Sequence, residues 1–315
     1  MNEILVTGGA GFIGSYLSEK LLKDQNNRLV IIDDLSTGDK SKLPKKHNDR
    51  YRFIKVDVNN YKDISEIFRS FHFDYVFHYA ALVGVKRTQD NPVKVLEDIH
   101  GIEYLLNLSK NGGVKRVFFS SSSEVYGEPV VFPQNEDTTP LNSKVPYAIV
   151  KNVGEAFFKS FKKEYGLDYT IFRFFNTYGP KQSKDFVMSR FINMALKNED
   201  ITIYGDGNQA RTFCFVNDNI DATCEIFRQA MINPKMENDI INIGTDFEIK
   251  IIDLAKKIIK LTDSKSKIVF LPALEEGDMK RRLPDVSKMK KYLNREMKSI
   301  EDGIKEVLKD TSYIL

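Results

Sequence analysis

The sequence is poor in several features that mark particular classes of protein. Its 315 residues include no tryptophan, two cysteines and four histidines, and the formal net charge is only +3. A chain of this length can bury a large core without disulfides, so Cys214 and Cys224 favour a reducing, cytoplasmic setting. The histidines lack the spacing of metal ligands, and we expect no metal site. The small charge gives no reason to expect nucleic acid as a partner.

Long apolar runs are missing as well. No segment approaches the ~20 residues of a membrane-spanning helix. The amino terminus passes directly into a strand-like run, so we expect neither a membrane partner nor a signal peptide. A hydrophobic content of 42% and a charged content of 29% are those of an ordinary globular protein with one or two packed domains.

Strand-like and helix-like segments alternate through the first half of the chain. Apolar, strand-like runs lie at 4–7, 29–32, 51–56, 75–79, 115–120 and 169–174, and helices are expected at 13–23, 64–71, 92–111 and 147–165. The alternation predicts an α/β fold with a Rossmann-like, doubly wound parallel sheet. Each strand ends in polar or small residues, and in such sheets ligands bind beyond the carboxyl ends of the strands.

A glycine-rich segment, TGGAGFIG, follows the first of these strands. The spacing of Gly8, Gly11 and Gly14 lets the backbone turn tightly and approach a pyrophosphate, and the helix that follows offers free N–H groups. Asp33 ends the second strand, where a carboxylate accepts hydrogen bonds from the ribose hydroxyls. Asp33 and Asp34 would repel a 2′-phosphate, so the pattern favours NAD over NADP. The alternative is a structural turn followed by a solvated acidic pair.

A tyrosine and a lysine stand four residues apart at Tyr147 and Lys151, a spacing that places both on one helix face. An adjacent ammonium lowers the pKa of a phenol. Such a pair can remove a proton from a sugar hydroxyl while the carbon gives hydride to nicotinamide. Tyr16 and Tyr51 also have a lysine four residues on, as expected by chance. Only the Tyr147 pair follows a serine-rich strand end, and we favour a catalytic role for it.

That strand end is the segment 120–127, SSSSEVYG. Four hydroxyls at a buried strand end are costly unless they are hydrogen-bonded. They can cap a turn or satisfy loop amides. Alternatively, one serine binds the substrate hydroxyl beside Tyr147, and Glu124 offers a carboxylate to the sugar. Both interpretations can hold for different members of the run.

Taken together, these segments make the chain similar to the extended short-chain dehydrogenase/reductases, in their NAD-dependent nucleotide-sugar epimerase/dehydratase/decarboxylase group. The similarity covers nearly the whole chain and is carried by TGGAGFIGS (7–15), DDLSTG (33–38), HYAALVGV (78–85), SSSSEVYGEP (120–129), PYAIVK (146–151), RFFNTYGP (173–180), IYGDGNQARTF (203–213) and RRLPD (281–285).

The resemblance implies a role for individual residues. For NAD binding they are Gly8, Gly11, Phe12, Ile13, Gly14, Asp33, Asp34, Asp57, Val58, Ala80, Ala81, Tyr147 and Lys151. For catalysis they are Ser122, Glu124, Tyr147 and Lys151. For binding the nucleotide-diphosphate sugar they are Ser122, Asn176, Val187, Arg211 and Arg282. Arginine suits a diphosphate because its guanidinium makes paired hydrogen bonds to phosphate.

The resemblance also has implications for the domains of the chain and for its oligomeric state. Beyond Pro180 the strand–helix alternation loosens, with helices expected at 186–197, 219–231, 251–261 and 300–308 and strands at 201–204 and 240–243. We expect residues 1–180, joined by roughly 213–245, to form an NAD-binding Rossmann domain. Residues 181–315 would mainly form a smaller α/β domain that binds the nucleotide sugar. A homodimer through helices 92–111 and 147–165 is implied as well.

The reaction itself is less specified. The favoured expectation is a 4-epimerase that passes through a transient 4-keto sugar and enzyme-bound NADH, acting on a UDP-sugar. PYAIVK is epimerase-like, whereas Glu124 and Arg282 are typical of UDP-glucuronate decarboxylases and nucleotide-sugar 4,6-dehydratases. Dehydratases usually carry aspartate in place of Ser123, and 4-epimerases tend to carry arginine near Glu275. A protein of another class, a non-catalytic NAD-binding sensor, is the remaining alternative.

Overall fold

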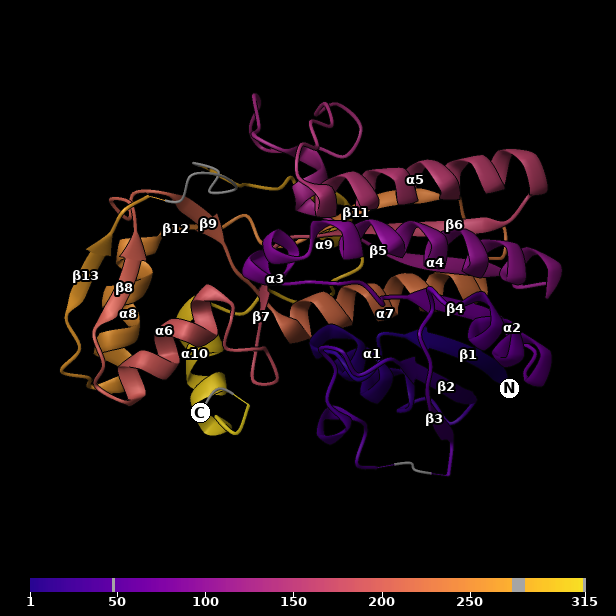
Figure 1. Ribbon diagram of the computed structural model, residues 1–315, viewed down its shortest axis with the longest axis horizontal. Coiled ribbons are helices and arrows are strands. Elements are labelled where there is room, and N and C mark those ends of the chain that lie inside the picture. Colours follow the sequence, from indigo (N-terminus) through magenta and orange to yellow (C-terminus); the bar gives the residue numbers. More distant parts are fainter. Residues whose placement is uncertain (47–48, 274–280, 314–315) are drawn as a thin grey trace. The chain divides into compact units, whose positions relative to one another are not determined.

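The computed structural model describes residues 1–46, 49–273 and 281–313. Its largest element is a seven-stranded sheet (Figure 1) in the order β11-β6-β5-β4-β1-β2-β3. The pairs β3–β2, β2–β1, β1–β4 and β4–β5 are all parallel. The strands are β1 (Asn2–Thr7), β2 (Asn27–Asp33), β3 (Tyr51–Lys55), β4 (Tyr75–His78), β5 (Arg116–Ser122), β6 (Asp168–Phe174) and β11 (Asp239–Ile243). The predicted Rossmann-like parallel sheet is confirmed.

Successive side chains of the sheet alternate between two apolar layers, as the period of a strand requires. On one face Phe77, Phe118 and Phe172 stack across three neighbouring strands, with ring centroids 4.5 and 6.0 Å apart. Phe227 of α7 (Val216–Ile232) meets the first two of these rings edge-on. The other face carries the apolar cluster that includes Val76. Both faces are covered, which is why β4 and β5 are continuous runs of buried residues.

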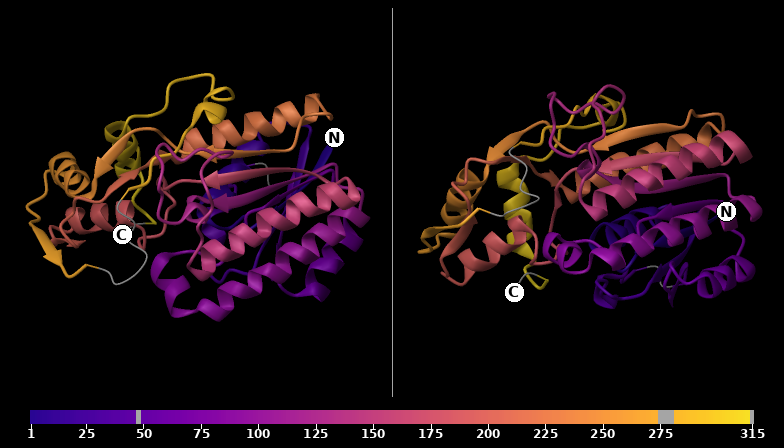
Figure 2. Two further views of the ribbon diagram at one scale, coloured as in Figure 1. Left: turned by 90° about the horizontal axis from the view of Figure 1, so that it is seen from above. Right: turned by 45° about the horizontal axis from the view of Figure 1, so that its top comes forward.

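Helices α2 (Tyr61–Ser70), α4 (Pro92–Asn111) and α5 (Pro146–Tyr165) contribute to the same cluster on that second face. Figures 1 and 2 show α4 and α5 side by side along the sheet. Each begins with a proline in its first turn, where no backbone N–H is required. Helix α5 ends at Gly166, whose φ of 77° is the left-handed conformation that terminates helices.

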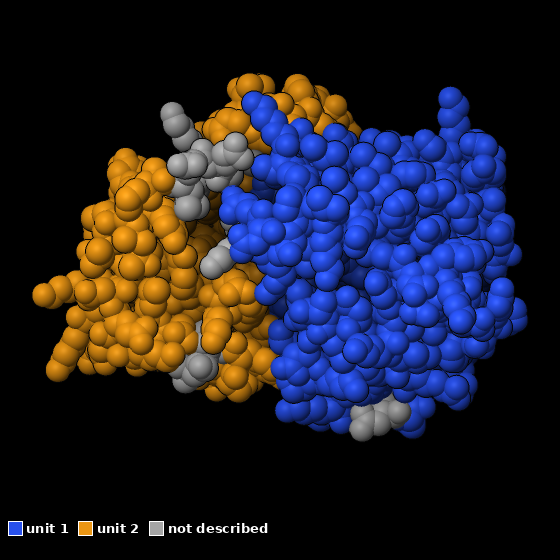
Figure 3. Space-filling view, in the orientation of Figure 1, with its two compact units in different colours: residues 1–125, 143–173, 223–241 blue, residues 126–142, 174–222, 242–315 orange. Residues whose placement is uncertain are grey.

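The chain divides into two compact units (Figure 3). Unit 1 comprises residues 1–125, 143–173 and 223–241, and unit 2 comprises 126–142, 174–222 and 242–315. One boundary between these units lies between Arg173 and Phe174, and residues 223–241 return to unit 1. The expected NAD-binding domain of residues 1–180 with roughly 213–245, and the sugar-binding domain of 181–315, stay predictions. Unit 1 also holds α1 (Phe12–Leu21), α3 (Val85–Asp90) and a 3₁₀ turn at Lys40–Lys42.

Unit 2 is built from short strand pairs and helices. Strand β7 (Thr177–Tyr178) pairs in parallel with β10 (Cys214–Phe215), and β8 (Ile201–Tyr204) with β13 (Ile268–Leu271). Strand β9 (Ala210–Thr212) pairs antiparallel with β12 (Glu248–Lys250). The helices of this unit are α6 (Val187–Leu196), α8 (Ile251–Thr262), α9 (Ser287–Lys290) and α10 (Ile300–Lys309). A 3₁₀ turn spans Ser123–Tyr126 at the junction of the units.

Every long helix and every sheet strand that the sequence predicts is present within a few residues of its predicted bounds. Among the described residues, the elements that the sequence did not predict are short: α3, α9, the 3₁₀ turns at Lys40–Lys42 and Ser123–Tyr126, and the strands β7, β9, β10, β12 and β13. Segments this short carry no clear period, because two or three side chains cannot display an alternation. Their pairing partners are also distant in the chain.

One buried ion pair ties β5, α5 and β6 together in unit 1. Glu155 of α5 and Arg173 of β6 are 1% and 2% exposed, and the guanidinium donates to both carboxylate oxygens at 2.9 and 2.7 Å. Ser121 of β5 donates to the same carboxylate at 2.6 Å. Hydrogen bonds that use most of the polar atoms of a buried pair are what make its burial tolerable.

We predict that Glu155→Gln lowers the free energy of unfolding by about 3 kcal/mol, because Arg173 then stays buried without a counter-charge. Urea denaturation measures the change. The surface pair Glu66–Arg69, at 2.8 Å, provides the matched control, and Glu66→Gln should change the free energy by no more than about 0.5 kcal/mol. Equal effects of the two variants would contradict the prediction.

Candidate active site

The glycine-rich turn joins β1 to α1 and packs closely against the end of β4. Gly8 has a φ of 67°, and a Cβ there would lie 2.7 Å from the backbone nitrogen of Ala80. Only glycine therefore allows the ends of β1 and β4 to approach this closely. Helix α1 has Gly11 as its N-cap and no side chain that caps its first N–H groups. These donors, at the positive end of the helix, suit a phosphate group.

Asp33, at the carboxyl end of β2, is bound to the same turn. Its Oδ2 accepts from the backbone N–H of Ala10 at 3.0 Å, and its Oδ1 accepts from that of Leu35 at 2.9 Å. Burial raises the pKa of this carboxyl group, while the two backbone donors oppose the shift. Asp34 differs from Asp33, since its Oδ1 accepts from both the amide and the hydroxyl of Ser36.

The end of β4 is held by hydrogen bonds that the sequence did not reveal. Thr7 Oγ1 accepts from the amides of Tyr79 and Ala80 at 3.1 and 3.0 Å, which leaves its hydroxyl proton for His78 Nδ1 at 2.9 Å. His78 is fully buried, and burial lowers its pKa to about 3. The imidazole is therefore neutral, with its proton on Nε2. A threonine and a histidine inside apolar strands were the only sequence signals.

The serines at the end of β5 divide into two groups. Ser120 donates to the carbonyl of His78 at 3.2 Å, and Ser121 donates to Glu155, so these two hydroxyls serve the buried framework. Ser122 accepts from the amide of Glu124 at 3.2 Å and is 8% exposed. The Glu124 side chain is partly exposed in the 3₁₀ turn that follows.

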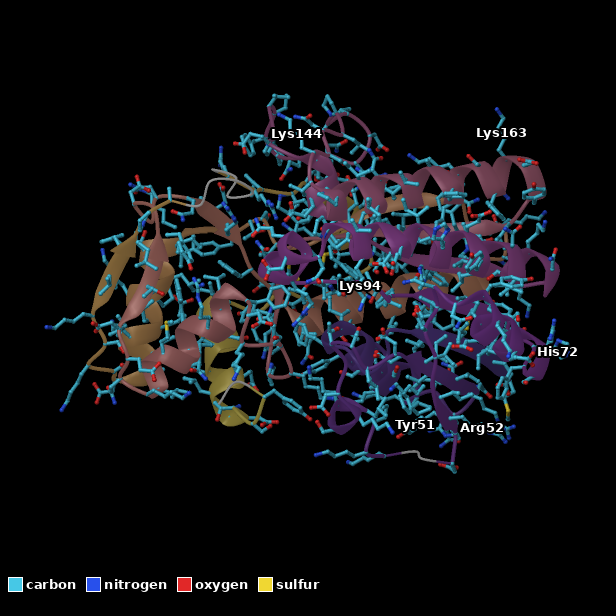
Figure 4. The ribbon with its side chains drawn as sticks, viewed as in Figure 1. Tyr51, Arg52, His72, Lys94, Lys144 and Lys163 are labelled. Atoms are coloured by element: carbon cyan, nitrogen blue, oxygen red, sulfur yellow. The ribbon has the colours of Figure 1, made fainter. Side chains whose placement is uncertain are left out.

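Tyr147 and Lys151 share one face of α5, as their spacing predicts. The Lys151 Nζ lies 5.7 Å from the centre of the Tyr147 ring and 4.9 Å from that of Phe119 in β5. Lys151 is 3% exposed, and burial lowers its pKa to about 8, although the negative charge of Asp98 opposes the shift. Tyr51, by contrast, lies in β3 (Figure 4), where its hydroxyl donates to the carbonyl of Pro44 at 3.0 Å.

Each remaining candidate has a definite place in its unit. In unit 1, Asp57 is exposed and accepts from the amide of Asn59 at 2.9 Å, and Val58 is buried. In unit 2, Asn176 donates to the carbonyl of Thr212 at 3.2 Å, and Val187 begins α6, which has no side-chain cap.

The two candidate arginines lie near each other in the fold of unit 2. Arg211 is in β9 and Arg282 follows Arg281, which forms a bridge with the β9 residue Ala210. Arg211 and Arg282 are 9% and 5% exposed, as expected for arginines with a binding or structural role. Arg281 makes hydrogen bonds of 2.6 to 3.0 Å to Glu248. Glu275 lies outside the described residues.

The described part of the chain lacks two further features. No cluster of three histidine, cysteine, aspartate or glutamate side chains there could hold a metal ion. No helix among the described residues is long and apolar enough to cross a membrane.

The sheet, the glycine turn and the Tyr147–Lys151 pair define the class: the chain has the features of an extended short-chain dehydrogenase/reductase. It belongs to the NAD-dependent epimerase/dehydratase family, whose model matches residues 4–244. The expected family, enzyme class and cofactor, NAD, are thereby confirmed.

Relatives of the chain carry the names of different reactions. The UDP-N-acetyl-α-D-glucosaminuronate decarboxylase of Bacillus cytotoxicus is 37% identical over 96% of each chain. A putative UDP-glucose 4-epimerase of Methanocaldococcus jannaschii is 33% identical over 97% of each chain. Among solved structures, the UDP-glucose 4-epimerase of Thermotoga maritima with UDP-glucose matches with a TM-score of 0.88 at 33% identity, over 98% of this chain and 97% of that one. The relatives thus establish the group of reactions but not the individual reaction.

The burial of Lys151 predicts a pH dependence of stability. An unfolded lysine keeps its proton up to about pH 10.5, whereas Lys151 loses its proton near pH 8 in the folded chain. Between these values the unfolded state binds more protons, so stability rises with pH. We expect the unfolding free energy of the wild type, relative to Lys151→Met, to rise by about 2–3 kcal/mol across this window.

Chemical denaturation between pH 7 and pH 10.5 measures the rise. Lys163→Met serves as the control, because Lys163 projects into solvent from the same helix (Figure 4) and its replacement should leave the pH dependence unchanged. A difference in unfolding free energy between the wild type and Lys151→Met that does not change with pH would overturn the prediction.

Proposed function

We propose that the protein oxidises a nucleoside-diphosphate sugar at C4 and completes the reaction as a 4-epimerase, with a UDP-sugar as substrate. The observation that carries the proposal is the Lys151 ammonium, buried against the face of the Tyr147 ring. A buried cation stabilises the phenolate form of its neighbour and so makes a tyrosine useful as a base near neutral pH. Ser122 follows on β5, the strand against which Lys151 packs through Phe119.

NAD fits the residues at the strand ends of unit 1. The uncapped start of α1 suits the pyrophosphate, and Asp33 and Asp34 suit the ribose. The full proposed set is Gly8, Gly11, Phe12, Ile13, Gly14, Asp33, Asp34, Asp57, Val58, Ala80, Ala81, Tyr147 and Lys151. When bound there, NAD would supply reversible hydride transfer at C4 of the sugar.

The side chains divide the remaining work. Tyr147 accepts the proton of the C4 hydroxyl and later returns it, while Ser122 orients that hydroxyl by a hydrogen bond. Lys151 stabilises the phenolate. In unit 2, Arg211 and Arg282 bind the diphosphate, together with Asn176 and Val187 at the start of α6. Two buried guanidiniums match the charge and geometry of a diphosphate.

Decarboxylation of a UDP-uronate is the second candidate, and two observations favour it. Glu124 stands two residues after Ser122 with a partly exposed side chain, and a relative with 37% identity is named as a uronate decarboxylase. Oxidation at C4 of a uronate creates a β-keto acid that loses CO₂ readily, so the same first step serves both reactions. Dehydration has less support, because Ser123, which stands in place of the dehydratase aspartate, is a hydroxyl and is 2% exposed.

A homodimer through α4 and α5 is part of the proposal. Val93 and Leu96 on α4 and Ile149 on α5 expose 73%, 40% and 37% of their surface. Apolar side chains exposed on neighbouring helices support an interface between copies of the chain.

The proposal is tested by incubating the protein and NAD with UDP-glucose, UDP-galactose, UDP-glucuronate and GDP-mannose. We expect transient absorbance of NADH and, by NMR, a 4-epimer as product. Tyr147→Phe should lower turnover by roughly 100- to 10,000-fold, since the base is lost. The control Tyr51→Phe should retain full turnover. No oxidation of any nucleotide sugar would instead indicate a non-catalytic NAD-binding protein.

A second variant separates the two candidate reactions. For a 4-epimerase, Glu124→Ala should leave turnover within roughly tenfold of the wild type, because no step needs a second acid or base. For a decarboxylase the same change should reduce the release of CO₂ and pentose from a UDP-uronate far more strongly. NMR of the products, with the wild type assayed on the same substrates, distinguishes the outcomes.

A further inference from the structure

Asp98 of α4 holds together two loops at the candidate NAD site. Its Oδ2 accepts from the amide of Leu82 at 2.9 Å, directly after Ala80 and Ala81 in the loop beyond β4. Its Oδ1 accepts from the side-chain amide of Asn59 at 3.0 Å, in the loop beyond β3. Both oxygens are acceptors, the pattern of an ionised carboxylate. One side chain therefore fixes two of the strand-end loops.

The same carboxylate lies on the helix that packs along α5, the helix of Lys151. One turn beyond the two residues the helices are in contact, since a Cβ on Gly154 of α5 would lie 3.1 Å from Cδ1 of Ile102 of α4. Burial lowers the pKa of Lys151, and Asp98 is the acidic group that opposes this shift. Burial likewise raises the pKa of Asp98, and Lys151 opposes that shift. The two groups thus stabilise each other's charged form across the site, although no salt bridge of 4.0 Å or less to Lys151 occurs among the described residues.

Among the residues that the structure describes, no acidic group other than Asp98 raises the pKa of Lys151. The Lys151 Nζ lies over the Phe119 ring of β5, and Tyr147 lies on the same helix. His78 of β4 is neutral because of its burial and because of Lys151 itself. Asp57, beyond β3, acts on Asp98 as a like charge and raises its pKa.

We propose that Asp98 is a positioning residue for the C4 oxidation: its carboxylate keeps Lys151 in the ammonium form and holds the loops beyond β3 and β4 against α4. This inference rests on the proposed function, in which the Lys151 ammonium stabilises the Tyr147 phenolate. Asp98 would thereby set the upper pH limit of activity without touching the substrate.

Asp98→Asn removes the charge while preserving the hydrogen bonds. The new amide oxygen can accept from Leu82. Asn59 Oδ1 is buried without a hydrogen-bond partner, so turning the Asn59 amide presents an acceptor to the new NH₂ group. The loops therefore keep their anchor in this variant, and the loss of charge is tested separately from the loss of structure.

The first measurement is the pH profile of kcat/KM. We expect the basic limb of the profile for Asp98→Asn to move down by roughly 0.5–1 pH unit, since Lys151 loses its attractive charge. Glu97→Gln removes a charge from the exposed side of the same helix and should leave the limb in place. An unmoved basic limb in Asp98→Asn, whatever its thermal stability, would overturn the proposal and leave a structural role only.

The second measurement does not need turnover. The unfolding free energy of the wild type, measured relative to Lys151→Met, should begin to rise near pH 8. When Asp98→Asn is compared in the same way with the double variant Asp98→Asn/Lys151→Met, the rise should begin at lower pH. The same onset in both backgrounds would refute the charge effect. If no nucleotide sugar is oxidised but the onset moves, the proposed function fails while the electrostatic coupling of Asp98 to Lys151 stands.

Discussion

A chain of hydrogen bonds across three strand ends is the constraint on which the rest of the site depends. Thr7 of β1 donates to His78 of β4, whose carbonyl accepts from Ser120 of β5. The carboxyl ends of parallel strands lie at the same edge of the sheet. These hydrogen bonds hold the ends of β1, β4 and β5 in register at that edge. The glycine turn follows β1, the next loop follows β4, and Ser122 lies at the end of β5. This chain of hydrogen bonds therefore helps to set the positions of all three.

The burial of Lys151 in α5 lowers the stability of the folded chain and, in the proposed mechanism, supports catalysis. Lys151 is held in an apolar environment that disfavours its charge, and the rings of Phe119 and Tyr147 with the distant charge of Asp98 offset only part of that cost. One turn further along the helix, Glu155 forms a fully paired ion pair with Arg173. The two buried charges of α5 therefore differ. Glu155 is neutralised by Arg173 in a structural ion pair, whereas the charge of Lys151 can act on Tyr147.

The residues proposed for oxidation at C4 do not decide which reaction follows it. In the proposed mechanism, oxidation at C4 uses the Tyr147–Lys151 pair and a nicotinamide, and this first step would be common to epimerisation, decarboxylation and dehydration. The outcome depends on groups near C5 and C6 of the sugar, of which Glu124 is the candidate in unit 1. Relatives of similar identity carry names of different reactions, which agrees with a family that varies a few side chains around a constant first step.

The sequence by itself determined the sheet, the glycine turn and the Tyr147–Lys151 spacing, because periodicity, tight turns and helix faces are local properties of the chain. It also favoured the Tyr147 pair over the pair at Tyr51, which lies in a strand. Only the tertiary structure decided which serines are engaged, why His78 is neutral, and that the charge of Asp98 acts on Lys151. Those facts depend on burial and on contacts between residues far apart in the chain, which no local pattern records.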